Sequence, residues 1–126
     1  MTTNKLLPTE ITLHQRSHNL EISFNDGSNF NLPAEYLRVY SPSAEVQGHG
    51  PGQEVLQIGK HNVNIDKIEQ VGHYAIQLYF DDNHHTGIFS WETLYSLGKN
   101  YESNWQRYLQ RMKEAGHEHP AARHLQ

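Results

Sequence analysis

Residues 19–32 read Asn-Leu-Glu-Ile-Ser-Phe-Asn-Asp-Gly-Ser-Asn-Phe-Asn-Leu, and this stretch decides the fold more than any other. Leu20, Ile22 and Phe24 alternate with polar residues, which is the period of a β-strand that has one face in a core. The Asp-Gly pair that follows tolerates the positive φ of a tight turn. We therefore expect the chain to reverse here and to return as a second strand.

The segments on either side extend this hairpin. Ile11 and Leu13 alternate in the same way ahead of it, so we expect a three-stranded meander over about residues 9–32. Pro33 suits the first turn of a helix, where a missing N–H costs nothing, and this short helix is predicted to end near Tyr40.

The chain from Val55 onward carries a second β pattern. Val63 and Ile65 alternate with polar residues, and a stripe of alternating apolar residues follows. Residues of this stripe are predicted to lie in the core: Tyr74, Ile76, Leu78 and Phe80. A strand at residues 88–89 follows the loop of residues 81–87, so we expect the strands to pair mostly antiparallel.

After Ser90, which is a good N-cap, the apolar residues recur at helical spacing. This pattern covers about residues 91–115, and Gly98 divides it into one broken helix or two short ones. The sequence thus predicts an α+β fold with a mostly antiparallel β-sheet, a short helix after the first meander, and C-terminal helices packed on the sheet.

Length and composition fit one domain. The chain has 126 residues, of which 36% are hydrophobic and 19% charged, enough to form a core without disulfide bonds. We divide it into an N-terminal extension (1–8), a single domain (9–115) and a flexible histidine-containing tail (116–126). No stretch has the pattern of a signal peptide or a membrane span, so we expect a cytoplasmic protein that does not contact membranes.

Composition also argues against several kinds of chemistry. The chain has no cysteine, which excludes thiolate metal sites and cysteine nucleophiles. A net charge of −4 without a cluster of lysine and arginine does not favour nucleic-acid binding. No histidine has an acidic residue two places on, as the iron site of a 2-oxoglutarate oxygenase requires. We therefore predict no catalytic residues and no enzyme activity.

Motifs spread along the chain give it a family resemblance. In order, they are Leu-Pro-Ala-Glu-Tyr-Leu-Arg at 32–38, Ser-Pro-Ser-Ala-Glu at 41–45, Gly48-His49-Gly50-Pro51-Gly52, and Gly-Ile-Phe-Ser-Trp-Glu-Thr-Leu at 87–94. Over about residues 8–108 the chain resembles the gamma-butyrobetaine hydroxylase-like N-terminal domain, in its free-standing bacterial form. In the carnitine-pathway oxygenases this domain precedes a separate catalytic domain, helps it to dimerise and binds a structural zinc.

The resemblance also implies where that zinc site would lie. The three cysteine ligands of the family fall by position on Ser41, Ser43 and Val46, and the histidine ligand falls on His84. Serine and valine do not supply the thiolate or nitrogen donors that tetrahedral zinc prefers. We therefore expect this zinc site to be absent.

Several histidines, His84 among them, are candidate ligands for a different metal site. His84 and His85 lie in one loop with Asp82, and imidazole and carboxylate groups together suit zinc or iron, although the same residues can form an ordinary polar loop. His49 lies between two glycines and is either a contact for a ligand or an exposed loop residue. The tail offers a weaker set of chelating side chains: His117, His119 and His124.

The preferred hypothesis is a non-catalytic accessory or adaptor domain that binds another protein through residues 41–53 and the loop around His84. The resemblance implies a metalloenzyme or an iron–sulfur assembly factor as the partner, because related domains are fused to an ATPase that carries iron–sulfur clusters. It also implies a homodimer as one assembly. The alternative is a metal-ion-binding protein that uses His84, and an enzyme of unrecognised type ranks third.

Overall fold

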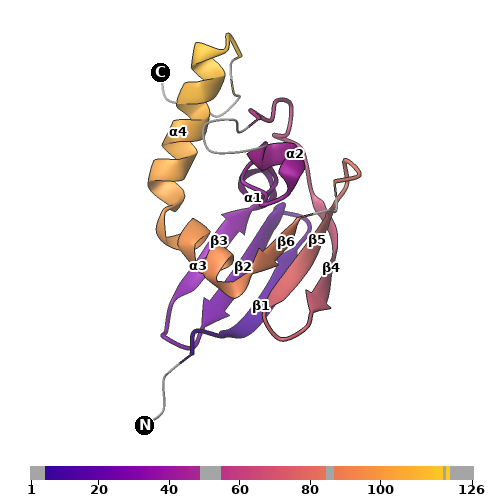
Figure 1. Ribbon diagram of the computed structural model, residues 1–126, viewed down its shortest axis with the longest axis vertical. Coiled ribbons are helices and arrows are strands. Elements are labelled where there is room, and N and C mark those ends of the chain that lie inside the picture. Colours follow the sequence, from indigo (N-terminus) through magenta and orange to yellow (C-terminus); the bar gives the residue numbers. More distant parts are fainter. Residues whose placement is uncertain (1–4, 49–54, 85–86, 118, 120–126) are drawn as a thin grey trace.

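The computed structural model describes residues 5–48, 55–84, 87–117 and 119. Strands and helices follow one another along the chain as Figure 1 shows. Their bounds are β1 (Pro8–His14), β2 (Asn19–Phe24), β3 (Asn29–Pro33), α1 (Ala34–Val39), α2 (Ala44–Gln47), β4 (Ile65–Val71), β5 (Ala75–Phe80), β6 (Ile88–Ser90), α3 (Trp91–Lys99) and α4 (Tyr101–Glu114). The predicted α+β class is therefore confirmed.

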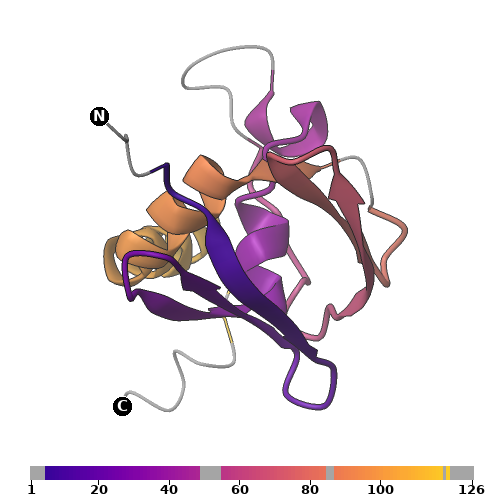
Figure 2. The same ribbon diagram turned by 90° about the horizontal axis from the view of Figure 1, so that it is seen from below.

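The strands form two antiparallel sheets, with the orders β1-β2-β3 and β4-β5-β6. In the first sheet Leu20 lies opposite Leu32 and Ile22 opposite Phe30, so the alternation seen in the sequence places apolar side chains on one face. The two sheets lie on opposite sides of α1 (Figure 2). Both sheets thus contribute their apolar faces to one core.

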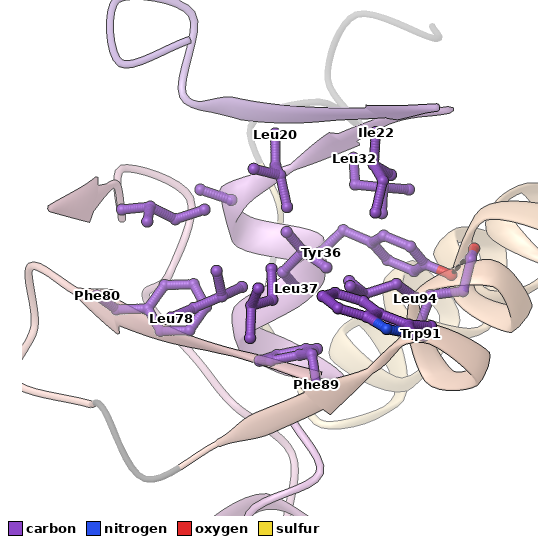
Figure 3. Close-up of a cluster of buried hydrophobic side chains, with 14 of the residues drawn as sticks. Leu20, Ile22, Leu32, Tyr36, Leu37, Leu78, Phe80, Phe89, Trp91 and Leu94 are labelled. Atoms are coloured by element: carbon purple, nitrogen blue, oxygen red, sulfur yellow. Dashed lines mark hydrogen bonds between the residues drawn. The ribbon is translucent and has the colours of Figure 1, made fainter. Parts of the chain in front are cut away.

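Helix α1 is the centre of that core, because all six of its residues are buried. Leu20, Ile22 and Leu32 approach it from one sheet, while Leu78 and Phe89 approach it from the other (Figure 3). A short helix buried all round cannot shed its charged side chains into water, so each one needs a partner inside the protein. Those partners define the candidate site described below.

The two C-terminal helices pack in different places. Helix α3 lies against β3, and a side chain on Gly98 would collide with the ring of Phe30. Helix α4 packs instead against α1, where the Tyr36 ring meets the rings of Tyr101 and Trp105 edge to face. The Tyr36 hydroxyl also donates to the Leu97 carbonyl at 2.6 Å. Two helices rather than one broken helix therefore close the core.

The structure corrects several sequence-based boundaries. The strand predicted from Val55 begins only at Ile65, since residues 55–64 form no regular element. Tyr74 was predicted to be core, but it lies in the β4–β5 turn and is 57% exposed. Pro33 ends β3 and α1 begins one residue later. Within the described residues, no helix is long and apolar enough to cross a membrane.

Candidate functional site

The loop after β5 begins with a tight turn that aims His84 into the protein. The Phe80 amide donates to the His84 carbonyl at 2.9 Å, and Asn83 takes a left-handed conformation with φ of 68°. Asparagine tolerates this region better than most residues. The His84 side chain is consequently buried, with only 3% of the residue exposed.

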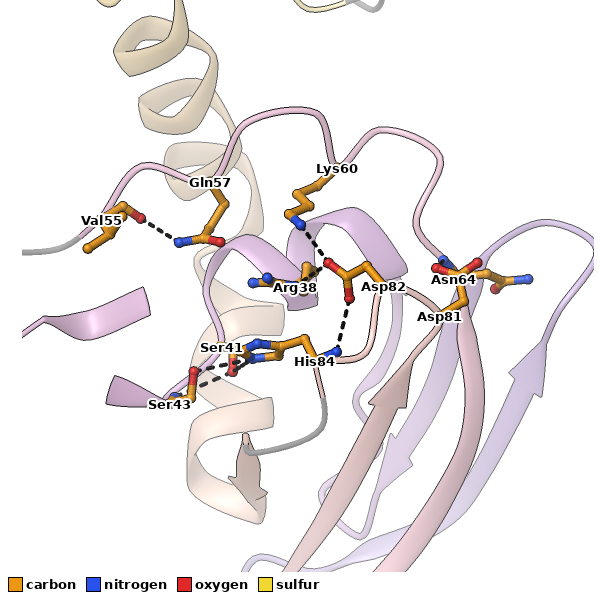
Figure 4. Close-up of polar contacts among 10 residues, drawn as sticks. All are labelled: Arg38, Ser41, Ser43, Val55, Gln57, Lys60, Asn64, Asp81, Asp82 and His84. Atoms are coloured by element: carbon orange, nitrogen blue, oxygen red, sulfur yellow. Dashed lines mark hydrogen bonds and ion pairs between the residues drawn. The ribbon is translucent and has the colours of Figure 1, made fainter. Parts of the chain in front are cut away.

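His84 meets two serines from the segment that follows α1 (Figure 4). Its Nε2 atom lies 3.0 Å from the Ser41 Oγ and 3.2 Å from the Ser43 Oγ. Both serines are buried, and so is Val46 in the adjacent helix α2. The positions that the family resemblance assigns to zinc ligands thus lie together, but as a hydrogen-bonded group that we call the His84 clip.

Gly87 completes the His84 clip from the far end of the same loop. A side chain on Gly87 would collide with the Ser41 Oγ and press on the Phe89 ring. Glycine therefore allows the β5–β6 connection to approach the serines closely. This gives a physical reason for the glycine that opens the last of the family motifs.

The Asp82 Oδ1 atom accepts from the backbone amide of His84 at 3.3 Å, but the other carboxylate oxygen of Asp82 faces two different partners. Its Oδ2 atom accepts from the Arg38 Nε at 2.9 Å and from the Lys60 Nζ at 2.6 Å. Burial by itself would raise the pKa of Asp82, but the hydrogen bonds and charges of Lys60 and Arg38 outweigh it and hold the pKa below its ordinary value. Asp82 therefore anchors the buried Arg38.

These contacts do not assemble the predicted metal site. The Asp82 carboxylate and the His84 imidazole point to different partners (Figure 4), and no group of three or more histidine, cysteine or acidic side chains suited to a metal occurs among the described residues. One imidazole, two hydroxyls and a valine do not fit tetrahedral zinc. The other predicted ligands, His49 and His85, lie outside the described residues, as do Gly50, Pro51 and Gly52 of the predicted interaction loop.

Comparison with known proteins agrees with the motifs quoted above. Residues 11–95 match the family described as gamma-butyrobetaine hydroxylase-like, N-terminal. The chain belongs to this family. No match was found among the curated proteins.

Solved structures similar to this gamma-butyrobetaine hydroxylase-like domain include two NMR solution structures. One is 48% identical with a TM-score of 0.77, and the match covers 92% of this chain and 88% of that chain. The other is 45% identical with a TM-score of 0.78, covering 89% and 88%. A crystal structure of a protein of unknown function from Acidithiobacillus ferrooxidans, of the DUF971 family, is 38% identical with a TM-score of 0.61, covering 72% and 91%.

A second buried polar group, which sequence reasoning missed, lies between α1 and α4. The Glu35 Oε2 atom accepts from the Tyr108 hydroxyl at 2.7 Å and lies 2.6 Å from the His119 Nε2. Burial, the hydrogen bond to Glu35 and its charge all raise the pKa of Tyr108. His119, which the sequence placed in a flexible tail, is thus buried against the domain, whereas His117 is exposed. His124 lies outside the described residues.

Next to the His84 clip, a hollow of about 480 Å³ opens between α1, α2 and α4. The described residues that line it are Val39, Tyr40, Val46, Gln47, Asn104, Arg107 and Arg111. The two arginines were also missed, although their spacing of four residues within a predicted helix places them on one face. We call this feature the arginine hollow.

Proposed function

We propose that this domain is a non-catalytic accessory or adaptor module that binds another protein through α2 and the arginine hollow beside it. The observation that carries the proposal is the His84 clip, which fixes the base of residues 41–53 beside that hollow. The Val55 amide, donating to the Val46 carbonyl at 2.8 Å, ties the other end of this segment to α2. The described residues Val46 and Val55 are therefore held together by this hydrogen bond.

A fixed base matters for binding because ordering a loop costs conformational entropy. The Gln47 side chain donates to the Ser41 carbonyl at 3.0 Å, which links α2 to the buried serines. A partner that docks here would meet a surface already held in place. This supports a recognition role for α2 and the buried serines that precede it.

The proposed partner is a metalloenzyme or an iron–sulfur assembly factor, a choice that rests on the family resemblance. A second copy of the chain is the competing partner. Metal binding through His84 is the competing function, but the serine hydroxyls that face this imidazole are weak donors for zinc or iron.

The absence of cysteine makes the proposal directly testable, since one introduced thiol can carry a photo-cross-linker. Gln47→Cys places the probe at an exposed position of α2, while Thr12→Cys places it at an exposed position of β1 as the matched control. We expect extract from the native cell to give one product with the α2 probe, which mass spectrometry identifies and the purified partner reproduces. Equal labelling from both positions would contradict the proposal, and a product of twice the chain mass would indicate a second copy.

A further inference from the structure

The turn between β2 and β3 carries a reactive pair of residues. Asp26-Gly27 is the one Asp-Gly pair of the sequence, which has no Asn-Gly pair. Aspartate isomerises readily before glycine, because glycine has no side chain to hinder attack by its amide nitrogen on the preceding carboxyl group. Both residues are exposed, and Gly27 has φ of 90° with open space where a Cβ would lie. Solvent therefore reaches the reacting groups.

The reaction at this pair needs only water. The Gly27 nitrogen attacks the Asp26 Cγ atom, a C–N bond forms, and the amide proton leaves with a carboxyl OH as one water molecule, which closes a succinimide ring. Water then adds to the main-chain carbonyl of Asp26 and breaks its original bond to the Gly27 nitrogen. The chain now continues through the former side-chain carboxyl as isoaspartate.

Three hydrogen bonds oppose this reaction in the folded protein. The Tyr95 hydroxyl donates to the Asp26 Oδ2 at 2.7 Å, and the Ser28 amide donates to the Asp26 Oδ1 at 2.9 Å. The Gly27 amide donates to the Phe24 carbonyl at 3.0 Å. Before the new C–N bond can form, the carboxylate must give up a donor and the amide its acceptor.

Tyr95 differs from the other donor because it belongs to α3, 69 residues away in the sequence. Its ring meets the rings of Phe24 and Phe30 edge to face, with centroids 5.2 and 5.6 Å apart. These contacts hold the ring, so its hydroxyl stays beside Asp26. The docking of α3 on the β2–β3 hairpin therefore restrains the turn.

The charge state of Asp26 points in the same direction. The hydrogen bond from Tyr95 is the main reason that the pKa of Asp26 lies below its ordinary value, with smaller contributions from Ser28 and Lys99. The neutral carboxyl group reacts more readily than the carboxylate, because one of its oxygens leaves as water. Tyr95 thus favours the less reactive form.

We infer that Asp26-Gly27 is a site of spontaneous isomerisation to isoaspartate, and that Tyr95 is the positioning residue that restrains it. Isoaspartate adds a methylene group to the main chain of the turn, so the product cannot keep the contacts of Asp26 as they are. The modification would therefore loosen α3 from the hairpin. This inference goes beyond the proposed adaptor function, since it involves neither α2 nor the arginine hollow.

The test follows isomerisation in the full chain at mildly acidic pH by peptide mapping with mass spectrometry. Isoaspartate leaves the peptide mass unchanged but blocks cleavage by endoproteinase Asp-N. We expect Tyr95→Phe, which keeps the ring contacts, to accelerate isomerisation at Asp26 by about tenfold, as expected for loss of one hydrogen bond to a charged group. Tyr36→Phe is the matched control, because it removes a buried hydroxyl that donates to Leu97 of α3 and leaves the contacts of Asp26 intact. It should change the rate by less than about twofold.

Two further measurements separate the role of Tyr95 from a general loss of stability. In urea, wild type and Tyr95→Phe should isomerise at the same rate, and Asp26 should react faster than Asp66, which precedes a lysine. An NMR titration of the folded proteins should give Asp26 a higher pKa in Tyr95→Phe than in wild type, and an unchanged pKa in Tyr36→Phe.

Three results would overturn the inference. An unchanged rate in folded Tyr95→Phe would show that its hydroxyl does not restrain Asp26. Equal acceleration in Tyr36→Phe would assign the effect to lower stability of the whole domain. Faster reaction at Asp66 than at Asp26 in urea would show that Asp26-Gly27 is not the preferred site.

Discussion

The two charged residues of the buried helix α1, Glu35 and Arg38, differ in how deeply their partners are buried. Glu35 is enclosed by Tyr108 and His119, and the side chains of Glu35 and His119 are only 10% and 7% exposed. Arg38 is as deeply buried at 6%, but its partner Asp82, and Lys60, which binds the same carboxylate, are each 22% exposed. Glu35 is thus enclosed by α4 and the C-terminal segment, and Arg38 is enclosed by the loop that carries His84.

The difference shows how a short helix can organise distant parts of the chain. Each buried charge fixes one segment, because leaving it unpaired would cost several kcal/mol. The Arg38 side is the more vulnerable, since guanidinium cannot neutralise itself by losing a proton. Its Nη1 atom is buried without a hydrogen-bond partner among the described residues, so Asp82 carries much of the compensation.

The largest loss of folding stability is expected when the partner of Arg38 is removed. Asp82→Ala should lower the free energy of unfolding by about 3 kcal/mol in urea denaturation, because it leaves the Arg38 charge buried and uncompensated. Lys60→Ala keeps the Arg38–Asp82 pair and should cost less than about 1 kcal/mol. Equal losses in the two variants would refute the assignment of Asp82 as the anchor of Arg38.

The second largest loss of stability is expected at Gly87, at the far end of the loop that carries His84. Gly87→Ala should destabilise the domain by about 2 kcal/mol, because the new methyl group overpacks the His84 clip. In a Ser41→Ala background the colliding hydroxyl is gone, and the same substitution should cost under about 1 kcal/mol. Thermal unfolding of the four proteins closes this double-mutant cycle. A penalty that does not depend on Ser41 would show that the collision lies elsewhere.

Removing a hydrogen bond to Glu35 should destabilise the domain less than the changes around Arg38 and Gly87. Tyr108→Phe removes one donor from a charged acceptor that keeps His119, so we expect a loss of about 1.5 kcal/mol. Tyr40→Phe removes a hydrogen bond to the neutral Asn104 carbonyl and should cost about 0.5–1 kcal/mol. Urea denaturation at neutral pH compares the two, and the reverse order would contradict the comparison.

The smallest expected effect is on how the free energy of unfolding depends on pH in acid. Because the pKa of Asp82 is lowered below 3.8 in the folded protein, the stability it contributes is fully present above that ordinary value and is lost as pH falls through the folded pKa. Unfolding free energies measured at falling pH below about 4 should therefore decrease less steeply in Asp82→Asn than in wild type. Identical slopes would show that Asp82 has no lowered pKa.

Sequence patterns predicted the sheets better than the centre of the fold. The alternation of Leu20, Ile22 and Phe24 was enough to place a strand and its buried face. The same rule failed at Tyr74, because a turn breaks the alternation there and periodicity does not register turns. Helix α1 could not be recognised as buried, since Glu35 and Arg38 give it the composition of a surface helix until their distant partners are known.

The sequence likewise predicted one part of the candidate site and not the other. The family motifs indicated that Ser41, Ser43 and His84 belong together, and the structure joins them by hydrogen bonds. The arginine hollow depends on how α4 crosses α1 and α2, which no local pattern encodes. The four-residue spacing of Arg107 and Arg111 puts them on one helix face, but sequence reasoning missed them because spacing gives no indication of what that face meets.

We propose that side chains of this domain hold the His84 loop without needing a metal ion. Elemental analysis of untagged protein, combined with thermal unfolding before and after treatment with EDTA and with added zinc, tests it most directly. We expect less than about 0.1 equivalent of zinc or iron, and a melting temperature that moves by less than about 1 °C in either treatment, since only a bound ion would shift it. Stoichiometric metal that disappears in His84→Ala, together with a melting temperature lowered by several degrees in EDTA, would show instead that a metal ion holds this loop.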